Sequence, residues 1–133
     1  MNAAVYDAPP MFGGLWPMSS GFESVRGGKF GAALASVSSV ASDAGMDTLA
    51  WCADQLDSLS KVIAESGRNS RMEKVVNALN FVSLLETYRL SSDVPEHVKL
   101  ALDDFSLIGS TFVADCLDLV SDQVDANQRG GSR

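Results

Sequence analysis

The chain has 133 residues, of which 46% are hydrophobic and 20% are charged, and its formal net charge is −7. This length fits one domain with a core of its own, and this composition is typical of a globular rather than a disordered protein. The acidic balance argues against nucleic acid and anionic membranes as partners, because both would repel the chain, and it is compatible with a basic protein partner.

Neither a secretory leader nor a membrane-spanning segment is expected. The first residues lack the basic start and the unbroken apolar run of a signal peptide. The longest uncharged stretch of the helical part, residues 30–42, is shorter than the roughly 20 apolar residues that a bilayer requires. Cys52 and Cys116 lie among apolar helical positions, which favours buried thiols, although a bridge is possible if their helices pack side by side. These features predict a protein of a reducing compartment, the cytoplasm.

Residues 1–28 differ from the rest of the chain. They contain three of the four prolines and two glycine pairs, so no helical or strand period persists, yet they are too aromatic for an ordinary flexible tail. We expect an irregular arm that packs its apolar side chains on the protein's own bundle or on another molecule. The candidate contact residues of this arm are Tyr6, Phe12, Leu15, Trp16 and Phe22.

Two helices are predicted to follow the arm. The first runs from about residue 29 to 44 and ends at Gly45, and the second begins at Asp47 as its N-cap and ends before Gly67. Both have an apolar stripe at helical spacing, which is typical of helices that pack in bundles. The stripes are Phe30, Leu34, Val37 and Ala41 in the first helix, and Leu49, Cys52, Leu56, Leu59 and Ile63 in the second.

A capping box, S-x-x-E from Ser70 to Glu73, predicts the start of the third helix, which ends near Leu90. Apolar residues cover much of its circumference, so we expect it to be central in the domain. The fourth helix is predicted to begin after Asp93, with Pro95 in its first turn.

The fourth helix is predicted to run to about residue 126. The apolar residues before and after Gly109 keep the same helical phase, which favours one continuous or mildly kinked helix. Connections of about 2–4 residues indicate antiparallel neighbours. The expected fold is therefore an all-α, antiparallel four-helix bundle over residues 29–127, with the irregular arm at 1–28 and a disordered tail at 128–133.

The last third of the chain holds its charge imbalance. Residues 93–125 contain eight acidic residues and one lysine. Four of the acids recur at spacings of 3, 4 and 3 and share one helical face, here called the acidic row: Asp115, Asp118, Asp122 and Asp125. Four apolar residues at spacings of 4, 3 and 4 lie on the opposite face, expected to face the core and here called the apolar row: Val113, Leu117, Val120 and Val124.

Three interpretations of the acidic row, with Asp104 before it, are compatible with the pattern. A solvated face is favoured. A docking surface for a basic partner is the second, because negative charge near the helix C-terminus at Asp122 and Asp125 is locally unfavourable and suggests another purpose. A divalent metal site lacks a second element to complete its ligands. A basic cluster lies at the turn between the second and third predicted helices and consists of Arg68, Arg71 and Lys74. It is expected to be solvated, or to meet the acidic row of another copy.

No catalytic constellation is visible. His97 is the single histidine, and no zinc, phosphate-loop or dinucleotide motif occurs. We therefore expect a protein that is not an enzyme and needs no cofactor or metal: an acidic adaptor, chaperone or regulator that binds another protein through its last helix or its arm. The alternatives are a self-assembling structural protein, viral or phage in type, whose residues 1–28 reach a neighbouring subunit, a small ligand-binding bundle, and an inhibitor that mimics nucleic-acid charge.

Overall fold

The computed structural model describes residues 21–131, and side chains as far as Gln128. Helices account for nearly all of this part of the chain, and no strand occurs within it. The prediction of an all-α bundle is confirmed. The elements are α1 (Gly21–Arg26), α2 (Lys29–Asp43), α3 (Asp47–Ser66), the 3-10 turn η1 (Gly67–Asn69), α4 (Met72–Leu90) and α5 (Glu96–Gly131).

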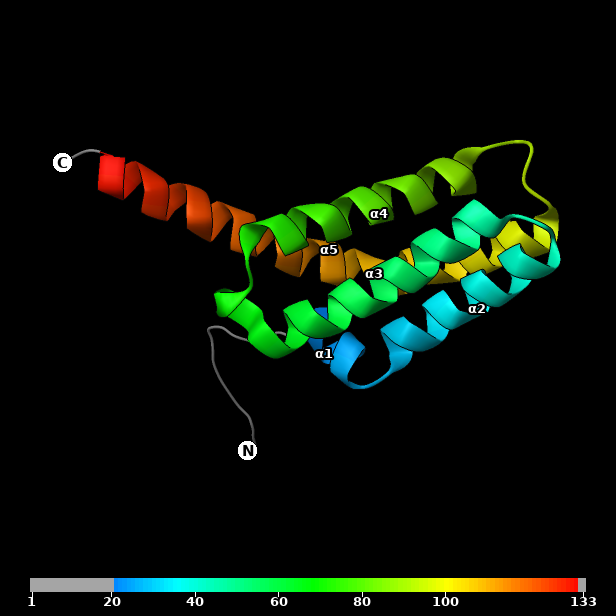
Figure 1. The fold of residues 1–133 in the computed structure, drawn as a ribbon, viewed down its shortest axis with the longest axis horizontal. Helices are drawn as coiled ribbons and strands as arrows, with labels where there is room; N and C mark the ends of the chain where they lie inside the picture. The colour runs from blue at the N-terminus through cyan, green and yellow to red at the C-terminus, as the bar shows by residue number, and fades with distance from the viewer. Residues whose placement is uncertain (1–20, 132–133) are drawn as a thin grey trace, which may run out of the picture.

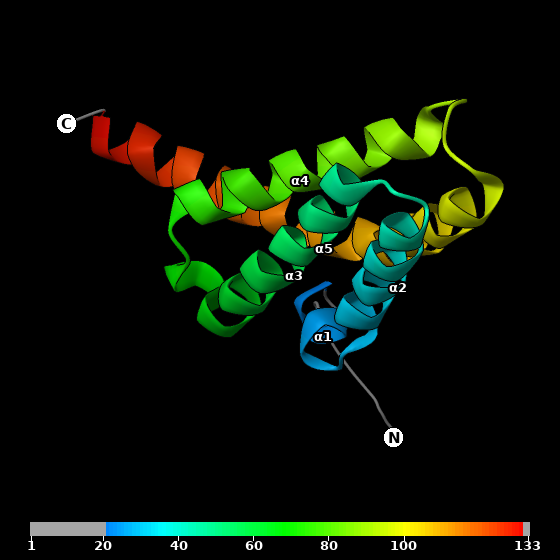
Figure 2. The same ribbon diagram turned by 45° about the vertical axis from the view of Figure 1, so that its right-hand side comes forward.

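The four long helices form a closed ring. Each of α2, α3 and α4 packs on the next helix in the chain, and α5 packs back on α2. Successive helices run in alternating directions (Figure 1), and the rotated view shows the same order around the ring (Figure 2). Short connections force this arrangement, because a chain that turns within a few residues must return beside the helix it has just left.

Aromatic side chains from α2 and α5 fill the core that the four helices enclose. The ring of Phe30 lies 5.3 Å from that of Phe105 and 4.6 Å from that of Phe112. The predicted stripes of α2 and α3 face this core, with only Leu59 left partly accessible. The predicted stops are also confirmed, since Gly45 and Gly67 take the left-handed φ values of 75° and 55° that favour glycine.

The predicted boundary of the arm is corrected, because residues 21–26 form the helix α1. The last proline of the arm is at residue 17 and its second glycine pair begins at residue 27, so a short helix fits between them. Helix α1 packs against α5, α3 and α2, and the ring of Phe22 meets that of Phe112 at 5.8 Å. The other candidate residues of the arm, Tyr6, Phe12, Leu15 and Trp16, lie outside the described residues.

Two predicted helix caps and one predicted position are wrong. The hydroxyl of Ser70 donates to the carbonyl of Ile63 at 3.2 Å. It accepts no hydrogen bond from the first N–H groups of α4, whose N-cap is Arg71. Asp47 is already the first helical residue of α3, so it cannot act as the N-cap. Helix α4 is not central, because it is one of the four sides of the ring and packs mainly on its neighbours α3 and α5. Its fully buried residues are Val75, Ala78 and Leu85.

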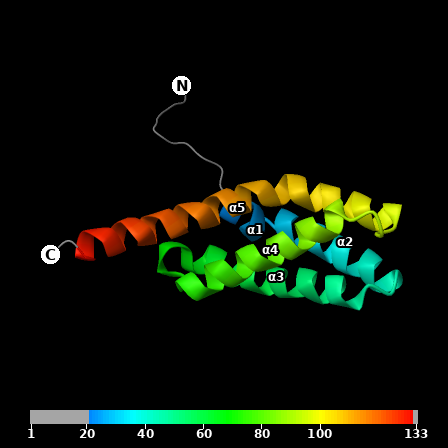
Figure 3. The same ribbon diagram turned by 90° about the horizontal axis from the view of Figure 1, so that it is seen from above.

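Helix α5 is unbroken and much longer than its neighbours. Gly109 does not interrupt it. This glycine is buried against Phe105, where a Cβ atom would lie 3.0 Å from Cζ. It continues through residues 128–131, where a disordered tail was predicted. Residues 121–128 are all exposed, and this end projects beyond the other helices (Figure 3). No helix in the described part of the chain is long and apolar enough to cross a membrane.

Candidate protein-interaction surface

The core-facing side of α5 differs from the predicted one. Phe112 and Cys116 are fully buried and Leu119 is partly buried, whereas Leu117 is 53% exposed and Val124 is 46% exposed. Successive residues of an α-helix are rotated by about 100°, which places the buried residues Phe112, Cys116 and Leu119 between the acidic row and the apolar row. Each row therefore flanks the core on its own side. The prediction that the apolar row faces the core is therefore wrong, and half of this row is left uncovered.

The acidic row is partly used inside the molecule. The carboxylate of Asp115 accepts a hydrogen bond from the backbone N–H of Phe22 at 3.0 Å, and the carboxylate of Asp122 pairs with the guanidinium of Arg68. Asp118 and Asp125 are exposed and have no hydrogen bond or ion pair with any described residue. Two of the four carboxylates thus hold α1 and η1 against α5, which reduces the charge available to a basic partner.

The predicted basic cluster is also engaged within the chain. Arg68 reaches the acidic row of its own α5, and Arg71 pairs with Glu73 at 3.3 Å. Both pairs are well exposed, so each contributes at most about 1 kcal/mol to stability. A contact between Arg68 and another copy would have to compete with its partner Asp122.

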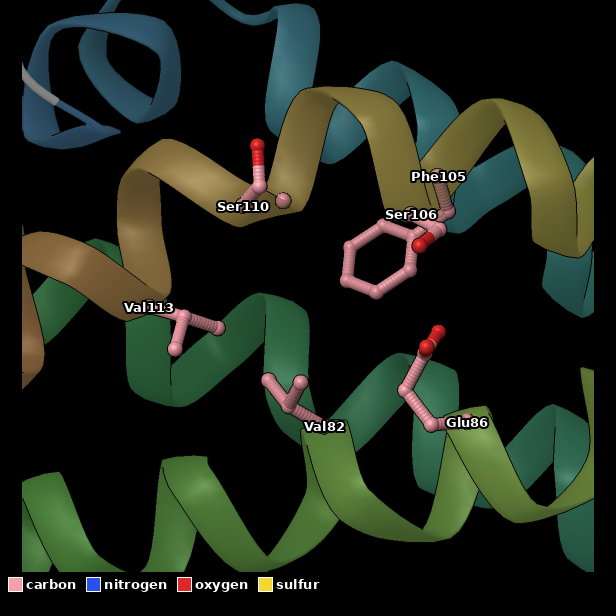
Figure 4. A pocket seen from close by; sticks show the side chains of 7 residues that line it. Val82, Glu86, Phe105, Ser106, Ser110 and Val113 are labelled. Carbon is pink, nitrogen blue, oxygen red and sulfur yellow. The ribbon is translucent and has the colours of Figure 1, made fainter.

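A groove of about 280 Å³ separates α4 from α5. Figure 4 shows Val82 and Val113 near one end, the ring of Phe105 between the two helices, and the carboxylate of Glu86 pointing across the groove towards Ser106. The lining is mainly apolar and includes small residues of α5 that keep the groove open. The lining residues are Val82, Glu86, Phe105, Ser106, Gly109, Ser110 and Val113.

A charged network marks the far end of this groove. The guanidinium of Arg89 donates to both carboxylate oxygens of Glu86, at 2.9 and 3.0 Å, and to Asp103 of α5 at 3.4 Å. The hydrogen bonds and charge of Glu86 raise the pKa of Arg89 above its ordinary value, with Asp103 adding to the effect. Through Asp103, this network bridges α4 and α5 at that end of the groove.

The groove continues as an apolar strip along the projecting end of α5. Leu117, Val120 and Val124 extend the line of Val113 at heptad-like spacing. On α4, Val76 is 44% exposed. It lies on the same helical face as Glu86, which lines the groove. The α4–α5 groove and this strip are together called the α5 seam. Val120 packs partly on the core, whereas no residue between 21 and 128 covers Leu117 or Val124 fully. An exposed apolar pattern of this kind is what an amphipathic helix would cover.

Other features provide weaker candidates. Trp51 is exposed on α3 and its ring meets that of Phe81 at 5.6 Å. A second groove of about 460 Å³ runs between α2 and α5 beside Leu107. Neither is continued by a projecting element as the α5 seam is.

The nucleophilic and metal-ligating groups are dispersed. Burial raises the pKa of the Cys52 thiol, and burial together with the charge of Asp115 raises the pKa of Cys116 to about 12. His97 is exposed at the start of α5. Among residues 21–131, no three histidine, cysteine or carboxylate side chains are grouped to hold a metal ion.

Comparisons with protein-family models, curated proteins and solved structures found no match. The α5 seam therefore has to be interpreted from its own residues. Sequence reasoning missed the α4 wall of the seam. The residues of α4 that line the groove are Val82 and Glu86, and their four-residue spacing, which places them on one helical face, is the signal that could have indicated it.

Proposed function

We propose that this protein is a non-enzymatic interaction module that binds an amphipathic helix of a protein partner along the α5 seam. One observation carries the proposal: within the described residues, Leu117 and Val124 of the apolar row are left about half exposed, and this row runs from the α4–α5 groove at Val113 onto the end of α5 that projects from the bundle. An isolated projecting end gains little from its apolar residues, whereas a bound helix would bury them.

The surroundings of the seam support the same function. The Arg89 network joins the two helices at the far end of the groove, so these side chains already have partners before a helix binds. The acidic row lies on the other side of α5 and would repel polyanions and acidic proteins that approach from that side. In this proposal the apolar side provides affinity, and the acidic side provides selectivity and solubility.

The test compares substitutions on two sides of α5. A double variant, Leu117→Lys with Val124→Lys, places charge in the seam, and Leu107→Lys places the same charge on a leucine that is 78% exposed towards α2. Each of these three positions is exposed, so the free energy of unfolding should change by no more than about 0.5 kcal/mol per site.

Proteins captured from a lysate of the producing cells would be identified, purified and measured by titration calorimetry. The proposal predicts direct binding to the wild type and to Leu107→Lys, with affinity lost in the double variant. Equal binding of the double variant and the wild type would exclude the α5 seam as the binding surface.

A further inference from the structure

We propose that the partner at the α5 seam is a second copy of this chain, with the two α5 helices antiparallel and each projecting end lying along the α4–α5 groove of the other copy. This inference rests on the proposed function, because it names the occupant of the same surface. An isologous contact of this kind requires one patch that is complementary to itself.

The charge distribution of α5 permits this contact despite the net charge of −7. Between residues 105 and 121, the charged side chains of α5 are Asp115 and Asp118, and both belong to the acidic row on the other side. The seam side of this interval carries apolar and small uncharged residues. Two copies can therefore approach through the seam without bringing carboxylates of the acidic row face to face. The residues beside the apolar row are Ser106, Ser110, Ala114 and Ser121.

The spacing of the apolar row matches an antiparallel pair. A two-fold axis midway between Leu117 and Val120 places Val113 of one copy beside Val124 of the other. Residues 121–128 of each copy then lie beside residues 109–116 of the other. The latter interval contains Gly109 and Ser110, which line the groove. In a parallel pair the projecting ends would meet each other, and both grooves would stay open.

The charges at the two ends of the contact are complementary in sign. The sequence from residue 126 to 133 contains two arginines and no acidic residue. Glu86 of α4 lines one end of the groove, and Asp103 of α5 is bonded to Arg89 beside it. The antiparallel sense directs the net-basic C-terminal sequence towards these carboxylates, whereas a parallel sense would direct two net-basic sequences towards each other.

Sedimentation equilibrium of the full chain provides the first test. We expect a reversible monomer–dimer equilibrium between about 1 µM and about 1 mM protein. The double variant Leu117→Lys with Val124→Lys should raise the dissociation constant by about 30-fold or more, because it places charge in the centre of the contact. The matched variant Leu107→Lys should leave the dissociation constant unchanged. A chain that stays monomeric over this range overturns the inference, and so does a dimer that both variants weaken equally.

The salt dependence separates this contact from a head-to-side contact between the basic cluster and the acidic row. Raising the ionic strength from about 0.01 to about 1 M screens both the repulsion between two acidic chains and the attraction at the ends of the contact. Because each chain has a net charge of −7, we expect the loss of repulsion to dominate, so a dimer through the seam should become tighter. A contact between Arg68 and carboxylates would become weaker. Dissociation at high salt therefore contradicts the inference.

Disulfide trapping tests the orientation. The native thiols are buried, so an added surface cysteine is the reactive group under mild oxidation. A mixture of Val113→Cys and Val124→Cys chains should form the cross-linked dimer, whereas either variant alone should not, because the pairing separates equal positions by about 16 Å along the helix. Efficient cross-linking of Val124→Cys with itself would show a parallel pair. If the chain is monomeric but binds another protein only when the seam is intact, the proposed function stands and this inference fails.

Discussion

Asp115 of α5 caps helix α1, which begins 94 residues earlier in the chain at Gly21: its carboxylate accepts a hydrogen bond from the backbone N–H of Phe22 at 3.0 Å. The first N–H groups of a helix have no partner within the helix, and a carboxylate at that end is favoured by the helix dipole. A residue of the acidic row is therefore part of the fold, and α1 is held by a contact that no local sequence pattern encodes.

Removing this cap should weaken the fold. Asp115→Ala should lower the free energy of unfolding by about 0.5–2 kcal/mol, as the loss of a capping side chain does. Asp115→Asn keeps an acceptor oxygen and should recover part of the loss. Urea denaturation checks both values. Asp118→Ala is the matched control, because Asp118 is exposed on the same row, and it should cost no more than about 0.5 kcal/mol. Equal costs for the two alanine variants would contradict the capping role.

The close approach of α1 to α5 depends on the glycine at its start. A Cβ atom on Gly21 would lie 2.0 Å from the backbone nitrogen of Phe112, so Gly21→Ala must displace α1. We expect a loss of about 1–3 kcal/mol, or detachment of α1 with faster hydrogen exchange at residues 22–26.

The control for this variant is Gly31→Ala in α2. There the nearest atom to the new Cβ is the side-chain oxygen Oδ1 of Asp57 at 3.0 Å, and a side chain can move where backbone cannot. The gain in helix propensity, about 1 kcal/mol, should offset this crowding. A loss for Gly31→Ala as large as that for Gly21→Ala would show that glycine content, and not the backbone contact, determines the effect.

The buried thiol of Cys116 should make stability fall at high pH. Burial, then the charge of Asp115, raises its pKa from the ordinary value of 9.0 to about 12. Between these values the unfolded chain binds fewer protons than the folded chain, so the free energy of unfolding decreases as the pH rises, by at most about 1.4 kcal/mol per pH unit. Below pH 9 both states keep the proton and this contribution is constant.

Chemical denaturation at pH 8 and at pH 10.5 measures this slope. Cys116→Ala lowers stability at both pH values through its cavity, but its stability should depend less on pH than that of the wild type. Other groups that titrate in this range are common to both proteins and cancel in the difference. Identical pH dependence in the two proteins would show that Cys116 does not titrate with a raised pKa.

The aromatic centre should be the most sensitive part of the core. Phe112 is fully buried and contacts the rings of Phe22 and Phe30, so Phe112→Ala should lower the free energy of unfolding by about 3–5 kcal/mol. Thermal and urea denaturation check this value. Leu107→Ala, at an exposed position of the same helix, should change stability by no more than about 0.5 kcal/mol. A loss below about 1 kcal/mol for Phe112→Ala would contradict the central role of this ring.

Periodic apolar residues and the glycines that end helices allowed much of the fold to be predicted from the sequence alone. The stripes of α2 and α3 and the terminating glycines at 45 and 67 appear in the structure as predicted, because burial of one helical face and a left-handed φ are local requirements. The continuity of α5 through Gly109 was also visible in the phase of its apolar residues. The failed caps show the limit of such patterns, since α3 already includes Asp47 and the hydroxyl of Ser70 bonds to Ile63 instead.

Only the tertiary structure decided which face of α5 the neighbouring helices bury. The sequence shows an acidic row and an apolar row on opposite faces, and both descriptions are correct. The buried line, through Phe112 and Cys116, lies between them because α1 and α2 pack on one flank of α5 and α4 packs on the other. Helical periodicity states which residues share a face, but the positions of neighbouring helices determine which face is covered, and that is why the α5 seam became visible only in the assembled bundle.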